Sequence, residues 1–212
     1  MSRGPSLVHR RIWVGGEKGI CVQEESASFL EEYARVPIAF EVSRFLELSV
    51  RDDALAGLGL VERALGEKWV KDYDAPAGNH PTDWARRFDL ENWGVLSARL
   101  GGAHVGGAVV ATKTPDLFML EGRSDLALLW DVRVAPQVRG RGVGSALFRA
   151  AEGWAATRGC RQLKIETQNV NVPACRFYLG QGCRLGAINR FAYTDLPEEV
   201  QLLWYKDLRP RP

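Results

Sequence analysis

Residues 126–148 read LALLWDVRVAPQVRGRGVGSALF, and this stretch decides the fold of the chain. Its first part, Leu126–Val134, is an apolar run rich in residues that favour strands, so it predicts a buried strand. Pro136 ends that run, and glycines follow at 140, 142 and 144. Apolar residues then recur at helical spacing through Leu147 and Trp154, which predicts a helix. The predicted order is therefore strand, glycine-rich turn, helix.

The turn between this strand and this helix is suited to hold an anion. The first amide N–H groups of a helix have no partner within the helix, and the helix dipole places positive charge there. Gly140, Gly142 and Gly144 have no Cβ atoms to hold a diphosphate away from those amides. Arg139 and Arg141 add positive charge. The sequence therefore predicts a phosphate site in this turn.

Other interpretations of the same turn differ in how well they fit. A nucleotide-binding P-loop is excluded, because no Gly-Lys-Ser/Thr follows the glycines. A dinucleotide-binding fold is disfavoured, because the glycine spacing differs and the turn lies late in the chain rather than in a first βαβ unit. A tight strand-to-helix turn with its arginines in solvent stays open as an alternative.

The composition is that of an ordinary globular protein. Apolar residues make up 46% of the 212 residues, and charged residues make up 25%. This length predicts one domain that spans residues 1–212. A net charge of +2 without a Lys/Arg run argues against nucleic acid as a partner. No secretory segment or membrane-length apolar run is visible, so we expect a cytoplasmic protein with no membrane partner.

The cysteines and histidines predict no metal site. Cys21, Cys160, Cys175 and Cys183 form no CxxC pair and lack the histidine spacing that is typical of zinc. We expect them to be reduced thiols in or near the core. The three histidines are scattered, and none stands beside a serine or cysteine as a catalytic triad would suggest.

The first half of the chain alternates between short strand patterns and short helix patterns. Glycines at 57 and 59 leave residues 55–65 open as strand or helix, and the turn formers at 71–79 predict an exposed loop. The other elements expected here are a strand near 11–14, a short helix near 28–33, a bulged strand within 36–50, a short helix from Pro81 capped by Asn79 or Thr82, and a hairpin of 93–100 with 105–112.

The second half adds further strands and one more helix. A strand is expected at 161–167, and then a helix capped by Asn171 that ends at Gly180 or Gly182. Strands at 183–193 and 201–207 are joined by a short connection, which favours an antiparallel edge. This alternation predicts an α/β fold class, with a mixed sheet covered by helices on both faces.

Two polar residues of the last predicted helix suit a thioester cofactor. Asn171 and Tyr178 are seven residues apart, about two helical turns, so both can face one cleft. The Tyr178 hydroxyl can donate a proton to a departing thiolate, and the Asn171 amide can bind a polar cofactor arm. A pantetheine arm would pair with the backbone at 132–134, at the carboxyl end of the central strand.

Two motifs together resemble the acetyl-CoA signature of the GNAT superfamily of N-acetyltransferases. They are Arg139-x-x-Gly142-x-Gly144 after a strand and Asn171-x-x-Ala174-x-x-x-Tyr178. The C-terminal half, which includes LKIETQNVNVPACRFY at 163–178, is similar to streptothricin acetyltransferases. The resemblance implies a GNAT fold with a mostly antiparallel sheet and one splayed parallel pair. It places the acetyl-CoA-binding core at 126–183 and leaves 1–60 as a divergent part.

The resemblance also implies site residues. Tyr178 would be the general acid for the CoA thiolate. The amine must also lose a proton before it attacks, either to a carboxylate or to an ordered water, and the candidate carboxylates are Asp131 and Glu166. No residue is expected to hold a metal. Contacts with acetyl-CoA are expected from Val132, Arg133, Val134, Arg139, Gly140, Arg141, Gly142, Val143, Gly144, Ser145, Asn171, Ala174, Phe177 and Tyr178.

The activity that the resemblance implies is direct acetyl transfer from acetyl-CoA to a primary amine of a small molecule. A streptothricin-like antibiotic is one candidate acceptor. A protein or peptide amine as acceptor, and an acyl-CoA sensor without turnover, stay open. Trp130, Trp204 and Tyr193 either line the acceptor pocket or pack in the core, and Cys175 is not needed for direct transfer. A homodimer is also open.

Overall fold

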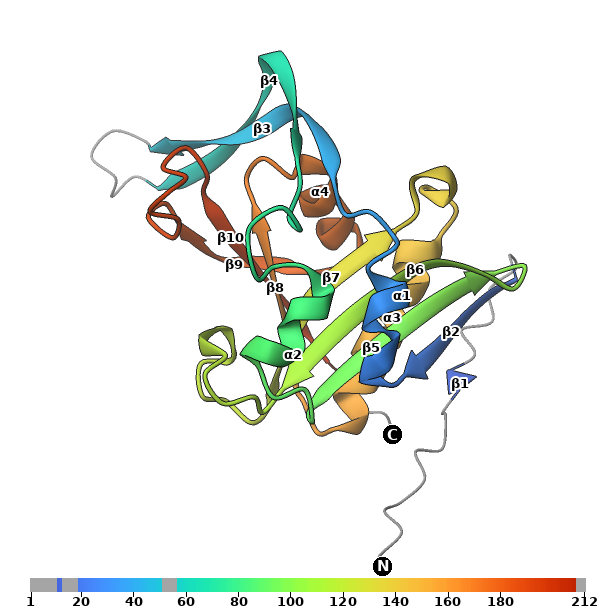
Figure 1. The fold of residues 1–212 in the computed structure, drawn as a ribbon. Helices are drawn as coiled ribbons and strands as arrows, with labels where there is room; N and C mark the ends of the chain where they lie inside the picture. The colour runs from blue at the N-terminus through green and yellow to red at the C-terminus, as the bar shows by residue number, and fades with distance from the viewer. Residues whose placement is uncertain (1–10, 13–18, 51–56, 209–212) are drawn as a thin grey trace, which may run out of the picture.

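The computed structural model describes residues 11–12, 19–50 and 57–208. One eight-stranded sheet has the strand order β1-β2-β5-β6-β7-β8-β10-β9, and β3 and β4 form a separate hairpin (Figure 1). The strands are β1 (Arg11–Ile12), β2 (Ile20–Glu25), β3 (Phe40–Val50), β4 (Leu58–Lys71), β5 (Trp93–Leu100), β6 (Ala103–Thr112), β7 (Leu126–Val134), β8 (Gln162–Gln168), β9 (Arg184–Asn189) and β10 (Gln201–Asp207). The α-helices are α1 (Leu30–Tyr33), α2 (Trp84–Arg87), α3 (Val143–Thr157) and α4 (Val172–Gly180).

The large sheet is mixed, as the sequence predicts. Among the described strands, only β7 and β8 pair in parallel, and the other neighbours in the sheet are antiparallel. A parallel pair needs a long crossover, and here α3 provides it between β7 and β8. The strand, turn and helix of residues 126–157 are therefore the unit that makes the sheet mixed.

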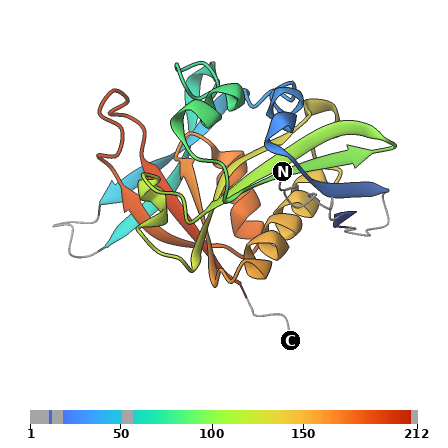
Figure 2. The same ribbon diagram turned by 60° about the horizontal axis from the view of Figure 1, so that its bottom comes forward.

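Helices cover both faces of this sheet. On one face, α3 buries Leu147, Ala151 and Trp154 against strands of the sheet. The helices α1 and α2 lie on the other face (Figures 1 and 2). There, Tyr33 of α1 and Trp84 of α2 belong to a second apolar cluster. This confirms the predicted arrangement. None of the helices in the described part of the chain is long and apolar enough to cross a membrane.

A bulge in β7 changes which side chains face the second cluster. Val109 of β6 lies opposite Asp131, whereas the next residue, Val110, lies opposite Leu129. Trp130 is therefore the extra residue on β7. Trp130 packs against the second cluster, and Asp131 accepts a hydrogen bond from Tyr33 of that same cluster. Two consecutive side chains thus reach one side of the sheet, which regular alternation forbids.

β7 and β8 separate beyond the bulge. Their parallel pairing runs only from Leu126 to Leu129. Within the described residues, the edge of β7 that faces β8 has no strand partner over 130–134. The start of α4 lies beside this opening (Figure 1). The carboxyl end of the central strand is therefore open to a ligand.

The hairpin of β3 and β4 is attached next to this opening. The amide of Leu46 in β3 donates to the Asn169 carbonyl at 2.9 Å, and the Asn169 side-chain amide donates to the Leu46 carbonyl at 3.0 Å. Leu46, Leu48 and Leu60 pack against the α3-side core. The loop that follows β4 lies beside the end of β8, because the hydroxyl of Tyr73 donates to Oε1 of Gln168.

Most predicted elements are confirmed, and two need comment. Residues 58–65 are strand, which settles the open choice for 55–65, although 55 and 56 lie outside the described residues. The expected strand at 11–14 is described only as Arg11–Ile12, and 13 and 14 also lie outside them. The bulge expected within 36–50 occurs between Val42 and Arg44.

The predicted cap of the helix near Pro81 is wrong. His80 takes the cap position with extended backbone, and its side chain makes no capping bond. The first turn is a short 3-10 helix over Pro81–Asp83, which leads into α2. The Asn79 carbonyl instead accepts the indole N–H of Trp84 at 2.8 Å. Asn79 thus contacts this helix through its backbone carbonyl, which binds the Trp84 indole, and not through a side-chain cap.

Candidate functional site

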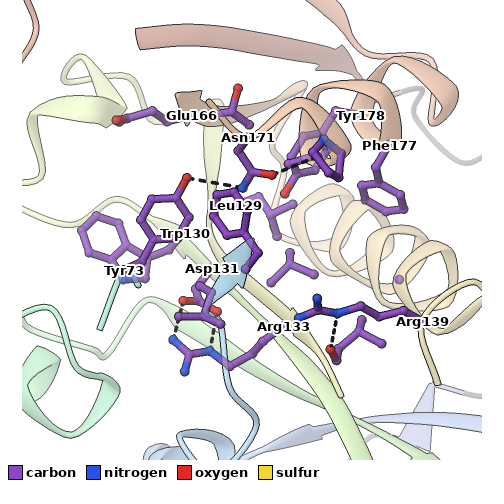
Figure 3. Close-up of a pocket in the computed structure, with 18 of the residues that line it drawn as sticks. Tyr73, Leu129, Trp130, Asp131, Arg133, Arg139, Glu166, Asn171, Phe177 and Tyr178 are labelled. Atoms are coloured by element: carbon purple, nitrogen blue, oxygen red, sulfur yellow. Dashed lines mark hydrogen bonds and ion pairs between the residues drawn. The ribbon is translucent and has the colours of Figure 1, made fainter. Parts of the chain in front are cut away.

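A cleft of about 950 Å³ lies where β7 and β8 separate (Figure 3). The glycine turn before α3 forms one end of it. The carboxyl ends of β7 and β8, the first turns of α4 and the loop after β4 form the other end. Its lining includes every residue predicted to contact acetyl-CoA or to move a proton except Arg141. The fold therefore brings together residues that are far apart in the sequence.

The turn end of the cleft presents unpaired amides. The Ala146 N–H is the first in α3 to reach a helical acceptor, the Gly142 carbonyl at 3.0 Å. Among the described residues, the amides of Gly140 and of 142–145 have no backbone acceptor. Gly140 and Gly142 have φ angles of 76° and 90°, which glycine adopts far more readily than other residues. These amides can bind an anion such as a diphosphate.

The unpaired edge of β7 connects the two ends of the cleft. Val132 and Val134 line it and also pack against the α3-side core. The Val134 carbonyl already accepts a hydrogen bond from Nε of Arg139 at 3.1 Å. The Arg139 side chain therefore lies against the turn to which it belongs. The Val134 carbonyl already has a hydrogen-bond donor, so it is less available to a ligand than the sequence suggests. Pairing of this edge with a pantetheine arm stays a prediction.

Asn171 caps α4, as predicted. Its Oδ1 accepts the Ala174 N–H at 3.1 Å, and Pro173 occupies the first turn. Its Nδ2 donates to the hydroxyl of Tyr73 at 3.3 Å. Both ends of the Asn171 amide are thus bound within the protein (Figure 3). Its predicted contact with a cofactor arm would have to add to these bonds or exchange with them.

The Tyr178 side chain lies on α4 between the two ends of the cleft. Its ring packs against Phe148 and Phe177, with centroids 6.0 and 5.1 Å away. Burial, and then the negative charge of Asp131, raise the pKa of Tyr178, so its hydroxyl stays protonated. Among the described residues the hydroxyl has no hydrogen-bond partner, and it faces the cleft (Figure 3). This proton is therefore available to a ligand.

Asp131 belongs to a buried charged cluster on the floor of the cleft. Nε and Nη2 of Arg133 donate to its two carboxylate oxygens at 2.9 and 2.8 Å. The same guanidinium donates to both oxygens of Asp74, at 2.9 and 3.0 Å, and lies 5.0 Å from the centre of the Tyr33 ring. Arg133 is only 2% exposed. Both oxygens of Asp131 are therefore already engaged.

This cluster keeps Arg133 charged and holds the loop after β4 in place. Burial of the guanidinium acts to lower the pKa of Arg133, but the hydrogen bonds and charges of Asp131 and Asp74 outweigh it and raise that pKa. The Arg133 side chain thus points to the carboxylates and away from the glycine turn. Only its backbone remains to meet the predicted contact with acetyl-CoA.

Glu166 is the other carboxylate offered by the sequence, and it lies on the opposite side of the cleft from Asp131 (Figure 3). Its Oε1 accepts a hydrogen bond from the Tyr193 hydroxyl at 2.5 Å. Among the described residues its Oε2 has no hydrogen-bond partner. Glu166 therefore retains a free acceptor atom, which Asp131 does not.

Several residues of the cleft were not predicted from the sequence. Tyr73 and Asp74 come from a stretch whose turn formers predict only an exposed loop. Tyr33 of the short helix α1 does not line the cleft but donates to Asp131, which does. An aromatic residue among turn formers, as in KDYDAPAGN at 71–79, is the one signal that points to Tyr73. Gln168 ends β8 and also lines the cleft.

The aromatic residues and the cysteine that had two interpretations are now placed. Trp130 lines the cleft, whereas Trp204 is buried and donates to Thr167 Oγ1 at 2.9 Å. Tyr193 does not line the cleft, but its hydroxyl donates to Glu166, which does. Cys175 is 3% exposed and lies 3.4 Å from Thr167 Oγ1, and burial raises its pKa. The described residues contain no cluster of three or more His, Cys, Asp or Glu that could hold a metal.

Comparison with known proteins gives a consistent result. Residues 41–182 match the model of the acetyltransferase (GNAT) family, which is more than half of the chain. This region contains the glycine turn, β8 and α4. It therefore contains the whole lining of the cleft apart from Pro37, Ile38 and Phe40.

Three relatives share a name. The chain is 37% identical over 81 residues to streptothricin acetyltransferase A of Bacillus subtilis, which covers 37% of this chain and 47% of that protein. It is 38% identical over 85 residues to the streptothricin acetyltransferase of Escherichia coli, covering 39% and 49%. With the enzyme of Streptomyces lavendulae it is 26% identical over 170 residues, covering 80% and 84%. The chain thus spans about half the length of the first two relatives.

Two solved structures share the fold. A nourseothricin acetyltransferase superimposes with a TM-score of 0.69 at 20% identity, over 91% of this chain and 100% of that one. A Bacillus anthracis protein assigned as a streptothricin acetyltransferase, solved in complex with acetyl coenzyme A, gives a TM-score of 0.68 at 23% identity, over 89% and 99%. At these identities the match speaks for the fold alone.

Proposed function

Because the chain belongs to the acetyltransferase (GNAT) family, we propose that it transfers the acetyl group of acetyl-CoA directly to a primary amine of a small molecule. One observation carries the proposal. One cleft has amides without a backbone acceptor at one end and carboxylates and aromatic rings at the other. Between them lies the hydroxyl of Tyr178. Neither these amides nor this hydroxyl has a hydrogen-bond acceptor among the residues that the structure describes.

In this proposal acetyl-CoA lies along the cleft from the glycine turn to Tyr178. The diphosphate binds the amides of Gly140 and 142–145, where the dipole of α3 favours negative charge. The pantetheine arm runs along the unpaired edge of β7, where its amides have backbone partners. Ala174 and Phe177 line the same cleft from α4. The complex of a structural neighbour with acetyl coenzyme A supports this choice of ligand.

The chemistry requires protons to move at two atoms. The amine nitrogen attacks the thioester carbon, the C–S bond breaks, and the CoA sulfur leaves with the electron pair. The ammonium form must lose a proton before attack, and the nitrogen loses a second one as the amide forms. Tyr178 donates one proton to the departing sulfur and recovers one from the solvent pool. The net result is an amide, CoA with a free thiol, and one proton released.

Two carboxylates are candidates for the group that takes the first proton. Asp131, the candidate named first from the sequence, has both oxygens bound to Arg133 and accepts from Tyr33 as well. Glu166 keeps Oε2 free among the described residues. Hydrogen-bonding capacity favours Glu166, and Asp131 stays a candidate whose replacement by asparagine tests it.

The acceptor end suits a cationic amine. Its walls include the aromatic rings of Tyr73, Trp84 and Trp130 and the carboxylates of Glu41 and Glu166. Aromatic faces and carboxylates both attract an ammonium group. Since relatives are named streptothricin acetyltransferases, we include a streptothricin-like antibiotic as the first acceptor to be tried.

The test is release of free thiol from acetyl-CoA in the presence of amines. The purified chain is given acetyl-CoA with a streptothricin-type antibiotic, with simple diamines, or with peptides bearing a free N-terminus or lysine. Thiol is followed with a chromogenic disulfide, and the product is identified by mass spectrometry. We expect thiol release and an acetylated small molecule. Thiol release with peptides alone would indicate a protein or peptide amine as the acceptor. Binding of CoA without thiol release in the presence of any amine would indicate an acyl-CoA sensor.

A further inference from the structure

Five side chains at the acceptor end of the cleft form one continuous chain of hydrogen bonds. Asn171 Nδ2 donates to the Tyr73 hydroxyl at 3.3 Å, and that hydroxyl donates to Gln168 Oε1. Gln168 Nε2 then donates to the Tyr193 hydroxyl at 2.9 Å, which donates to Glu166 Oε1 at 2.5 Å. The chain thus runs from the cap of α4 to the carboxylate that faces the cleft.

The direction of every donor in this chain is determined at its two ends. At one end, Asn171 Oδ1 accepts the backbone N–H of Ala174, so only its NH₂ group can face Tyr73. At the other end, the Glu166 carboxylate can only accept. The donor and the acceptor of each hydrogen bond between these two ends are then fixed, and so is the orientation of the Gln168 amide.

Gln168 is the member of this chain that accepts from one tyrosine and donates to the other. Its carbonyl takes the proton of Tyr73, and its NH₂ group occupies the lone pair of Tyr193. The Tyr193 proton is therefore directed to Oε1 of Glu166. A side chain at 168 that could only accept would compete with Glu166 for that proton.

The chain also ties two loops to β8. Tyr73 lies in the loop after β4, and Tyr193 lies in the loop between β9 and β10, on either side of Gln168 at the end of β8. Burial raises the pKa of both tyrosines, and the charge of Glu166 adds to the rise at Tyr193, so both hydroxyls stay protonated donors. The buried Lys71–Glu199 ion pair, 2.5 Å between Nζ and Oε1, lies beside the Tyr73 end.

We propose that Gln168 is a positioning residue for the acceptor: it fixes the Tyr193 proton on Oε1 of Glu166, so that Oε2 alone meets the ammonium group and takes its proton. This inference rests on the proposed acetyl transfer to an amine. It assigns the contact with the reacting amine to Glu166 and the orientation of that carboxylate to Gln168 through Tyr193.

The first test replaces Gln168 with glutamate, which has the same shape but no NH₂ donor. In Q168E the carboxylate accepts from both tyrosines, so the Tyr193 proton leaves Glu166. We expect kcat/KM for the amine to fall about tenfold, the loss expected for one charge-assisted hydrogen bond. The Kd of acetyl-CoA, measured by calorimetry, and the thermal midpoint should stay at the wild-type values. Unchanged kcat/KM for the amine would overturn the positioning role.

A double-mutant cycle asks whether Gln168 acts through Tyr193. Tyr193→Phe removes the donor to Glu166 directly, so we expect a similar loss of kcat/KM. If the assignment holds, adding Gln168→Glu to Tyr193→Phe costs little more, because the affected bond is already absent. Losses that simply add would overturn it. Tyr205→Phe is the matched control, since its hydroxyl lies on β10 and reaches Glu121 at 3.4 Å, and we expect wild-type kinetics.

Chemical rescue tests the role of Glu166 itself. In Glu166→Ala we expect loss of amine acetylation that added formate partly restores, because a small carboxylate can occupy the vacated position. Absence of rescue in a folded variant that binds acetyl-CoA would overturn the assignment to Oε2. A wild-type chain that releases no thiol with any amine would instead refute the proposed function, so the two failures are distinguishable.

Discussion

At the scale of single residues, Tyr178 combines two properties that a general acid needs. Its hydroxyl opens to the cleft, and burial keeps it protonated by raising its pKa. Phe177 and Phe148 hold the ring, so its position does not depend on the hydroxyl. The acid role can therefore be removed without disturbing the packing.

For Tyr178→Phe we expect kcat to fall about 10²-fold, the lower range for loss of general acid catalysis. The Kd of acetyl-CoA should change little, because the ring and its contacts remain. Steady-state kinetics and calorimetry on the same preparation measure both quantities. Turnover equal to that of the wild type would remove Tyr178 from the acid role and leave the proton to a water molecule.

Ser145 offers a test of the diphosphate site that spares the backbone. At Gly142, with φ of 90°, any side chain adds strain, but Ser145 lies in the regular first turn of α3. In Ser145→Glu the new carboxylate is favourable for the helix dipole yet competes with the diphosphate for the same amides. We expect the Kd of acetyl-CoA to rise about tenfold or more at an unchanged thermal midpoint.

Ser145→Ala serves as the control for this experiment. It removes the hydroxyl that accepts from Gln181 Nε2 at 3.1 Å but adds no charge. We expect its affinity for acetyl-CoA to stay within about threefold of the wild type. If the glutamate variant bound acetyl-CoA as tightly as the alanine variant, the diphosphate would have to bind away from this turn.

At the scale of elements, α3 approaches β5 so closely that one position tolerates only glycine. A Cβ on Gly94 would lie 2.3 Å from Cε2 of Trp154. The indole cannot move freely, because its N–H donates to Glu24 at 2.7 Å and the Arg158 guanidinium lies 3.7 Å from the ring centre. Glycine at 94 thus sets the distance between helix and sheet.

For Gly94→Ala we expect the free energy of unfolding to fall by about 1–3 kcal/mol, the usual cost of overpacking a core. Chemical denaturation measures it. Gly59→Ala is the control, since Gly59 also lies in a strand but its added Cβ would meet nothing within 4 Å. Equal stability of the two variants would mean that Trp154 can relax and that the close approach carries no strain.

β7 shows how one irregular element creates a site. Had its alternation continued without the bulge, Trp130 and Asp131 would face opposite sides of the sheet. The bulge places both beside α1 and α2, and the separation from β8 begins at the same point. The site therefore forms at the irregular part of the strand, while the regular part before it packs in both cores.

At the scale of the whole molecule, the core encloses most of the thiols. Cys160, Cys175 and Cys183 are 5%, 3% and 2% exposed, whereas Cys21 is half-buried. Burial raises the pKa of all three enclosed thiols, that of Cys183 to about 11. Because the thiolate is the reactive form, these thiols react slowly for two reasons: reagents cannot reach them, and they stay protonated.

We therefore expect one of the four cysteines, Cys21, to react with a chromogenic disulfide at pH 8 in the native protein, and all four to react after unfolding. Mass spectrometry of the labelled peptides identifies the site. Rapid native labelling of Cys175 would contradict its enclosed position and reopen a thiol mechanism. The homodimer that the sequence leaves open is tested by the mass of the protein in solution.

The amino-acid sequence by itself determined the local features of this protein. The strand at 126–134, the glycine turn, the cap at Asn171 and the hairpin of β5 and β6 depend on residues close together in the chain. These features depend on the period of hydrophobic residues, on missing Cβ atoms and on side-chain caps. Each of these effects acts over one or two turns, so a single stretch of sequence is enough to predict it. The same is true of the paired motifs that indicated acetyl-CoA.

Tertiary structure alone decided the acceptor end of the cleft. Arg133 binds Asp74, and Tyr33 donates to Asp131. Gln168 joins Tyr73 to Tyr193. These pairs lie too far apart in the sequence for a local pattern to predict them. These contacts form only once a buried guanidinium must be neutralised and buried hydroxyls must be hydrogen-bonded. The cofactor end is built from one continuous segment, while the acceptor end is assembled from loops that meet only in the folded protein.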